Sequence, residues 1–169
     1  KAAGDNPYAL CDAMVAETAA DSDVMFLPFL FGSNLSVDAT GSFLNLRAGS
    51  TRGAMARAIF EGVCFSHCWH MDRLLQYREN PTSLRLTGGA ANSTVWSQMF
   101  SDMFGLPLSI PGGGELGCLG AAICAAVGAG EFDSIPAACD AMARPGKNYE
   151  PDMAKHELYQ AKYKRYLQV

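Results

Sequence analysis

The sequence predicts an α/β fold, in which helices flank a sheet that has at least some parallel strand pairing. In the second half of the chain, short apolar runs that suit strands alternate with helical segments, an order typical of α/β layers. Two glycine-rich turns, at 88–89 and 112–114, each join an apolar run to a helical segment. Because a crossover helix returns the chain to the same end of the sheet, we expect the strands that it joins to pair in parallel.

Prolines and capping residues mark the elements of the first half. Pro7 suits the first turn of a helix, and Pro28 limits its strand to a sheet edge or an early end. Ser50 or Thr51 can cap the longest helix. The elements expected here are a helix over 7–20, a strand over 24–30, a loop over 31–40, a short strand or extended turn over 42–46 and a helix over 51–78.

The second half supplies the alternation of strands and helices. Gly105 is well placed as the C-terminal glycine of a helix. The last helix presents Tyr159, Tyr163 and Tyr166 at helical spacing on an apolar face. The elements expected here are strands over 83–86 and 106–110, helices over 91–104, 115–129 and 134–144, a turn at Pro145-Gly146 and a final helix over 151–167.

Composition bounds the class of protein. The 169 residues are expected to form one domain over 1–169 with a full core, because 49% of them are hydrophobic. The formal net charge is −4 and no basic block occurs, so we expect no nucleic-acid partner. Without a signal peptide or an apolar run long enough to span a bilayer, we expect a cytoplasmic protein with no membrane partner. The chain opens at Lys1 rather than at an initiator Met, which suggests a piece of a longer protein.

The cysteines are expected to be buried, reduced thiols, because they fall in apolar, helix-like settings and a chain with a full core has little need of disulfides. A metal site is the less favoured alternative. Cys64, His67 and Cys68 share one helical face and His70 follows, but zinc sites usually draw ligands from more than one element, and His156 is isolated. The cysteines lie at positions 11, 64, 68, 118, 124 and 139.

No group of residues predicts a catalytic step. Paired carboxylates are absent, and no nucleophile lies in a recognisable turn. Asp102, near the end of a helix, is expected to be a surface or packing residue rather than a base.

The first glycine-rich turn is the candidate binding site. Gly88 and Gly89 allow unusual backbone angles and leave no Cβ in the way, so a flat base or a phosphate could approach the main chain closely. Amide groups at the following helix start favour an anion, and Asn92 and Ser93 can cap that helix or bind a ligand. A tight strand-to-helix turn without a ligand is the alternative, since this is neither a P-loop nor a GxGxxG motif.

The second glycine-rich turn, Gly112 to Gly114, is interpreted as a flexible surface turn. Glu115 after it would stabilise the start of the next helix through the helix dipole. Gly117 and Gly120 lie three residues apart and give that helix a smooth face for close packing.

Several ordered motifs together resemble the C-terminal lobe of the FGGY carbohydrate kinases, over roughly residues 24–168. Within the family, the combination of FLPFLFGSN, EGVCFSH and MDRLL is most similar to the L-xylulose kinase group. The motifs are FLPFLFGSN (26–34), GSFLNLRAGSTRGAMARAIFEGVCFSH (41–67), TGGAANSTVWSQMFSDMFGLPLSIP (87–111), ELGCLGAAICAAVGAG (115–130) and YEPDMAKHELYQAKYKRYL (149–167).

This resemblance implies an actin-like ATPase (ribonuclease H-like) domain, with a mixed sheet flanked by helices. It implies a two-lobed kinase that uses ATP and Mg²⁺ to phosphorylate a sugar hydroxyl, with a ketopentose such as L-xylulose as the acceptor. The chain would be its C-terminal, nucleotide-binding lobe. The residues that the resemblance assigns to the adenosine site are Gly88, Gly89, Ala90, Asn92, Ser93 and, near the base or ribose, Gly53. Glu61 and Gly62 match a family signature for which we expect a structural role.

The resemblance also implies what lies outside the chain. The family's catalytic Asp, its phosphate loops and most sugar contacts would precede Lys1, mainly in an N-terminal lobe, so we expect no catalytic residue here, Mg²⁺ held mainly elsewhere, and no turnover by the chain alone. Asn45 replaces a glycine of the family signature, and we expect the turn to survive because Asn tolerates positive φ. The alternative is a non-catalytic actin-like interaction domain. Its apolar inter-lobe face would bind a protein, and in either case that face favours self-association into a homo-oligomer.

Overall fold

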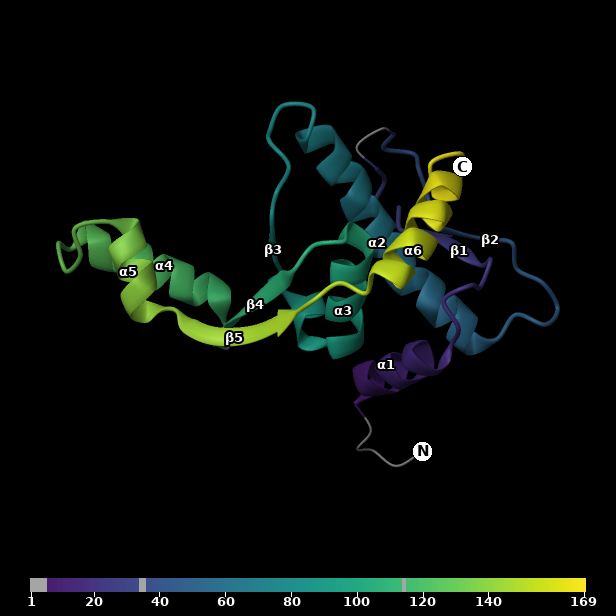
Figure 1. Cartoon of the computed structure of the whole chain (residues 1–169), viewed down its shortest axis with the longest axis horizontal. Helices are drawn as coiled ribbons and strands as arrows, with labels where there is room; N and C mark the ends of the chain where they lie inside the picture. Colours follow the sequence, from purple (N-terminus) through teal and green to yellow (C-terminus); the bar gives the residue numbers. More distant parts are fainter. Residues whose placement is uncertain (1–5, 34–35, 114) are drawn as a thin grey trace.

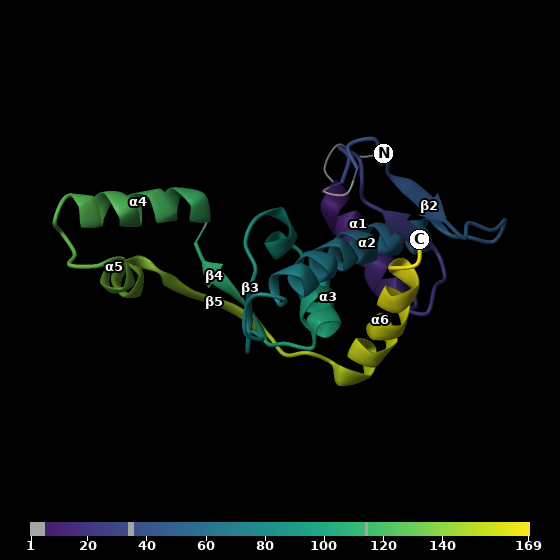
Figure 2. The same cartoon turned by 90° about the horizontal axis from the view of Figure 1, so that it is seen from above.

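The computed structural model describes residues 6–33, 36–113 and 115–169. Its elements are α1 (Pro7–Glu17), β1 (Met25–Leu27), β2 (Ser42–Leu44), α2 (Arg52–Leu74), β3 (Leu84–Arg85), the 3-10 turn η1 (Gly89–Asn92), α3 (Thr94–Phe104), β4 (Leu108–Gly112), α4 (Leu116–Gly128), α5 (Ile135–Met142), β5 (Arg144–Tyr149) and α6 (Met153–Tyr166). Figures 1 and 2 show a body that contains α1, α2, α3 and α6, from which β4 and β5 carry α4 and α5 away as an arm.

The sheet in the second half is mixed, as expected. β3 and β4 pair in parallel, with Leu84 opposite Leu108, and β4 pairs with β5 antiparallel, with Leu108 opposite Tyr149. The helix between the two parallel strands is α3, so the predicted strand–helix–strand unit is confirmed. β1 and β2 form a separate antiparallel pair, and β1 ends at Leu27, directly before Pro28.

The prediction of a turn at Pro145-Gly146 is wrong, because both residues lie inside β5. β5 is an edge strand, where a proline that cannot donate a backbone hydrogen bond is tolerated. Gly146 passes so close to the carbonyl oxygen of Ile110 that a Cβ would overlap it. The register with β4 also shifts between Ile110 and Gly112, so an irregular ladder accommodates both residues.

The helix expected over 91–104 begins as η1 and becomes α3 only after Ser93. Ser93 caps α3 by accepting a hydrogen bond from Trp96 N at 2.9 Å. α3 ends at Gly105, whose φ of 65° is the left-handed conformation expected of a C-terminal glycine. Asn45 has a positive φ of 59°, so the signature turn survives as expected.

The core lies where α2, α3 and α6 meet, and the predicted tyrosine face of α6 is part of it. Phe60 on α2 and Trp96 on α3 stack with ring centroids 4.3 Å apart. Gly62 allows β1 to cross α2 closely, since a Cβ would overlap the carbonyl oxygen of Phe26; its expected structural role is confirmed. The buried members are Val15, Phe60, Cys64, Phe65, Cys68, Met99, Phe100, Met103, Leu108, Tyr159, Tyr163 and Tyr166.

The arm is more exposed than the body. Ile123 of α4 and Ala138 of α5 are buried where the two helices pack together. No neighbouring atom lies within 4 Å of a Cβ placed on Gly117 or Gly120, so the close packing expected there is not made within the described residues. None of the helices in the described ranges is both long and apolar enough to cross a bilayer.

The cysteines all lie in helices and are free, but they differ in exposure. Cys64 and Cys68 on α2 are buried in the core, as expected. Cys118 and Cys124 on α4 are exposed, so the expectation of buried thiols is wrong for this pair.

Candidate functional site

A cavity opens where the parallel strands β3 and β4 end. It measures about 390 Å³ and lies between the turn after β3 and the turn after β4. Open α/β sheets commonly bind ligands outside the carboxyl ends of their strands. The lining residues are Thr87, Gly88, Gly89, Ala91, Asn92, Ile110, Pro111, Gly113, Glu115, Leu116 and Gly117.

The main chain at Gly88 and Gly89 forms an open ledge on the cavity wall. Gly88 has φ +84° and ψ −164°, a conformation that residues with a Cβ rarely adopt. Among the residues that the structure describes, no neighbouring atom lies within 4 Å of the position of a Cβ at either glycine. A flat ring can therefore lie against this main chain without meeting a side chain.

The start of α4 brings backbone N–H groups to the cavity wall, where Leu116 and Gly117 line the cavity. The first N–H groups of a helix have no intrahelical acceptor. Glu115 occupies the N-cap position, but its side chain does not cap them. This helix start therefore favours an anionic or hydrogen-bond-accepting group. Gly114, part of the predicted second turn, lies outside the described residues.

Besides Thr87, two polar side chains of the cavity wall have no hydrogen-bond or ion-pair partner among the described residues. Asn92 lies at the end of η1 and Glu115 precedes α4, and both are exposed. The Asn92 amide both donates and accepts hydrogen bonds, and the Glu115 carboxylate accepts them. The pair suits a ligand that carries hydroxyl or amino groups.

The other predicted site residues do not line the cavity. Ala90 packs against the core from within η1, and Ser93 caps α3 and donates a hydrogen bond to Asp12 Oδ1 at 2.7 Å. Gly53 lies in the first turn of α2, where a Cβ would overlap Thr18 Oγ1 beside α1. The structure therefore places Ala90 and Ser93 behind the ledge and gives Gly53 a packing role, so the contact of Gly53 with a base or ribose stays a prediction.

Sequence reasoning missed the second wall of the cavity. The turn after β4 and the start of α4 were interpreted as a surface turn and a packing helix, whereas Gly113, Leu116 and Gly117 line the cavity. The available signal was the parallel pairing itself. Two parallel strands end at the same edge of a sheet, so the glycine-rich turns that follow them must lie close together.

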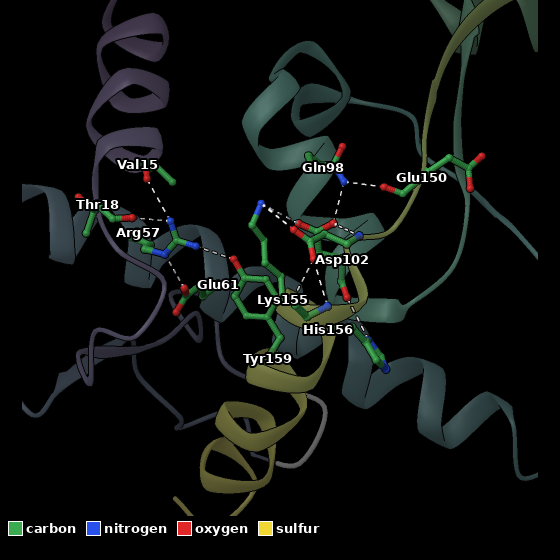
Figure 3. Close-up of polar contacts among 12 residues, drawn as sticks. Val15, Thr18, Arg57, Glu61, Gln98, Asp102, Glu150, Lys155, His156 and Tyr159 are labelled. Carbon is green, nitrogen blue, oxygen red and sulfur yellow. Dashed lines mark hydrogen bonds and ion pairs between the residues drawn. The ribbon is translucent and has the colours of Figure 1, made fainter.

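A network of buried charges joins α1, α2 and α6, as Figure 3 shows for Arg57. Arg57 donates to Glu61 Oε1 at 2.8 Å and to Tyr159 OH at 2.6 Å. Its Nη1 also donates to the carbonyl oxygens of Val15 and Thr18, at 3.1 Å and 2.8 Å. Arg57 thereby fixes the C-terminal end of α1 to the core.

Glu61 also forms an ion pair with Lys162 of α6, and both side chains are buried. Burial raises the pKa of the Glu61 carboxyl, against the opposing effect of Lys162 and Arg57. Burial likewise lowers the pKa of the Lys162 ammonium, and Glu61 opposes that shift. The contacts of Glu61 are structural, as expected for this position.

Asp102 is not at the surface, which corrects one of its two expected settings. It is 2% exposed, and its Oδ1 accepts hydrogen bonds from Gln98 Nε2 at 2.7 Å and from Asp152 N at 2.9 Å. Its backbone oxygen lies 3.0 Å from His156 Nδ1 (Figure 3). Asp102 joins α3 to the start of α6 and does not line the candidate cavity, so its role is packing.

The residues considered for a metal site are arranged differently. Cys64 and Cys68 are buried in the core, while the rings of His67 and His70 contact Phe100 and Trp69 edge-on. Within the described ranges, no group of three or more His, Cys, Asp or Glu residues is placed to hold a metal ion.

Comparison with known proteins gives a family match. The model of the FGGY family of carbohydrate kinases, C-terminal domain, matches residues 1–129. The L-xylulose/3-keto-L-gulonate kinase of Escherichia coli (strain K12) is 42% identical over 154 residues, 91% of this chain and 31% of that protein. A probable L-xylulose kinase of Pasteurella multocida (strain Pm70) is 39% identical over 150 residues, 89% of this chain and 30% of that protein.

Solved structures agree with the sequence matches. The crystal structure of xylulose kinase from Rhodospirillum rubrum superimposes with a TM-score of 0.83 and 29% sequence identity, over 98% of this chain and 34% of that one. The chain therefore spans about a third of the length of the kinases that it matches.

Proposed function

Because the chain belongs to the FGGY family of carbohydrate kinases and matches its C-terminal domain, we propose that it is the nucleotide-binding lobe of an ATP-dependent carbohydrate kinase. Its fold is the actin-like ATPase fold of these kinases. The observation that carries the proposal is the ledge at Gly88 and Gly89, where no neighbouring atom of the described residues lies within 4 Å of a Cβ position. The ledge borders the same cavity as the start of α4.

Adenosine lies on the main chain of Gly88 and Gly89 in this proposal. A purine can lie closely against main chain that carries no side chain, and both glycines supply such a surface. Asn92 and Glu115 offer hydrogen bonds to the hydroxyl and amino groups of the nucleoside. The first N–H groups of α4 favour the negatively charged part of the nucleotide, while Ser93 supports the turn from behind.

ATP with Mg²⁺ supplies the phosphoryl group that is transferred to a sugar hydroxyl, a reaction that depends mainly on positioning and on charge neutralisation. This lobe positions the adenosine. The catalytic Asp, the main Mg²⁺ contacts and most sugar contacts belong to the part of the kinase that the chain does not span, so the chain alone binds nucleotide without turnover. The names of two relatives support a ketopentose such as L-xylulose as the acceptor.

A non-catalytic interaction domain is the second candidate, and the exposed helix α4 favours it. α4 carries no charged side chain, and most of its residues are exposed. An apolar surface of this kind can bind a partner or a second copy of the chain. Sedimentation measured with and without ADP separates the two candidates. The kinase lobe binds ADP both as a monomer and as an oligomer, whereas the interaction domain does not bind ADP.

Calorimetric titration of the chain with ADP tests the nucleotide site, with Gly89→Val and Gly128→Val as matched variants. Gly89 has open space around it and no positive φ, so Val fits the fold but fills the ledge. Gly128 is equally open and ends α4, about 18 Å along the helix axis from Leu116. Loss of ADP binding in Gly89→Val alone supports the proposal. No binding by the wild-type chain, or equal loss in both variants, contradicts it.

A further inference from the structure

We infer that Asp12 on α1 is a positioning residue for the proposed nucleotide site, because it holds Ser93 and, through Ser93, the turn that carries Gly88 and Gly89. The inference rests on the proposed function. Ser93 Oγ donates a hydrogen bond to Asp12 Oδ1 at 2.7 Å and accepts one from Trp96 N at 2.9 Å. The one hydroxyl hydrogen of Ser93 is thus used by α1 while its oxygen caps α3, so both contacts fix the same rotamer.

Ser93 reaches the ledge through the hydrogen bonds of η1. Its N–H donates to the carbonyl oxygen of Ala90 at 3.1 Å, and the N–H of Ala91 donates to that of Gly88 at 3.1 Å. Ser97 Oγ donates to the carbonyl oxygen of Ser93 at 2.7 Å and holds it from the other side. A displacement of Ser93 therefore moves the turn on which the ledge depends.

α1 can act as a support because its C-terminal end is fixed. Arg57 donates to the carbonyl oxygens of Val15 and Thr18, and Figure 3 shows these contacts at the end of α1. Asp12 lies three residues before Val15, on a neighbouring part of the same helix face. The anchor at Arg57 thus sets the rotation of α1 that points Asp12 at Ser93.

The hydrogen bond, rather than the negative charge of Asp12, carries this role. The carboxylate lies near the start of α3, where the helix dipole also favours a negative charge. The contact that reaches the turn, however, is made through an oxygen acceptor for the Ser93 hydroxyl. An amide at position 12 keeps such an acceptor and removes the charge, so Asp12→Asn separates the two effects.

Calorimetric titration with ADP tests the inference on the 169-residue chain. Asp12→Ala removes the acceptor and is expected to raise the Kd for ADP about fivefold, within the range that mutations in coupled contacts produce. Asp12→Asn is expected to stay close to wild type. Glu17→Ala is the matched control, because it removes a carboxylate of α1 that has no partner among the described residues, and it is expected to leave the Kd unchanged.

Two further readouts separate positioning from stability. Asp12→Ala, but not Asp12→Asn, is expected to shift the amide resonances of Gly88 and Gly89 in the ADP-free chain. In a Ser93→Ala background, Asp12→Ala should add nothing to the change in Kd, as a double-mutant cycle requires when one residue acts through the other. A urea titration of each variant measures its free energy of unfolding, which a purely structural role would lower without changing the Kd.

The inference is overturned if Asp12→Ala matches Glu17→Ala, if Asp12→Asn binds as weakly as Asp12→Ala, or if the double variant shows additive effects. Unchanged amide resonances of Gly88 and Gly89 in ADP-free Asp12→Ala also overturn it, and this test needs no nucleotide. A wild-type chain that binds no ADP overturns the proposed function itself, which is a different outcome from a wild-type chain that binds ADP with no dependence on Asp12.

Discussion

Trp96 contacts Phe60 in two ways: their rings stack with centroids 4.3 Å apart, and the indole N–H donates a hydrogen bond to the Phe60 carbonyl oxygen at 3.1 Å. The pair joins α3 to the long helix α2. Because α3 follows directly after the turn that carries Gly88 and Gly89, the pair fixes the helix that supports this turn of the candidate site.

Substitutions at Trp96 separate the two contacts. Trp96→Phe keeps an aromatic ring and loses the hydrogen bond, so we expect the free energy of unfolding to fall by about 1 kcal/mol. Trp96→Ala also loses the packing and should cost about 3 kcal/mol. Urea unfolding followed by circular dichroism measures both. Trp69→Phe is the control, since the indole N–H of Trp69 makes no hydrogen bond to the described residues, and equal losses for Trp96→Phe and Trp96→Ala would contradict the account.

The buried pair of Glu61 and Lys162 predicts a strong asymmetry between single and double substitutions. Lys162→Met leaves the buried Glu61 carboxylate with Arg57 as its remaining charged partner, and we expect a loss of about 3 kcal/mol in the free energy of unfolding. Glu61→Gln together with Lys162→Met removes both charges of the pair, so it should cost less than the sum of the two single losses. Additive losses in urea titrations would argue against the pairing.

Asp152, the N-cap of α6, predicts a dependence of stability on pH. The backbone N–H of Lys155, followed by smaller effects including that of Ala154, holds the pKa of the Asp152 carboxyl below its usual value. The folded state then binds the proton less readily than the unfolded state. The contribution of the Asp152 carboxylate to the stability of the fold is therefore fully present above the unfolded pKa of about 3.9. It is lost as the pH falls through the folded-state pKa.

Asp152→Asn keeps a capping oxygen but cannot titrate. The stability advantage of wild type over this variant should therefore shrink between about pH 5 and pH 2, as measured by urea unfolding at each pH. Parallel stability curves for the two proteins over that range would contradict the role given to the cap.

Thiol reactivity should divide the cysteines by helix. Burial raises the pKa of Cys68 to about 12 and that of Cys64 well above its ordinary value, so these thiols stay protonated and shielded. Cys118 and Cys124 are exposed and should react with a thiol reagent such as DTNB in the folded chain. The double variant Cys118→Ser, Cys124→Ser should lose most of the fast phase of labelling. Fast labelling that survives in this variant and maps to Cys64 or Cys68 would contradict the burial of these two thiols in the core.

Local signals sufficed for much of the fold. Thr51 caps α2 and Gly105 ends α3, as the sequence predicts, because these effects act within one helical turn. β5 was missed because Pro145 and Gly146 are turn formers by themselves, and only the pairing with β4 makes them part of a strand. Long-range pairing of this kind cannot be recognised from the residues next to it in the sequence.

The candidate site divides in the same way. Gly88 and Gly89 could be predicted, since a lack of side chains is visible in the sequence. The match at Gly53 could not show that α1 packs against that glycine. The hydrogen bond between Asp12 and Ser93 joins residues 81 positions apart, and no spacing rule relates such residues before the chain is folded.

Chemical-shift mapping of ADP binding to the isotopically labelled chain tests the central claim most directly. The account predicts that the largest amide shifts on titration occur at residues 87–93 and at the start of α4, and that Gly89→Val abolishes them while Gly128→Val does not. Unchanged resonances at Gly88 and Gly89 at saturating ADP, or shifts confined to another face of the domain, would contradict it.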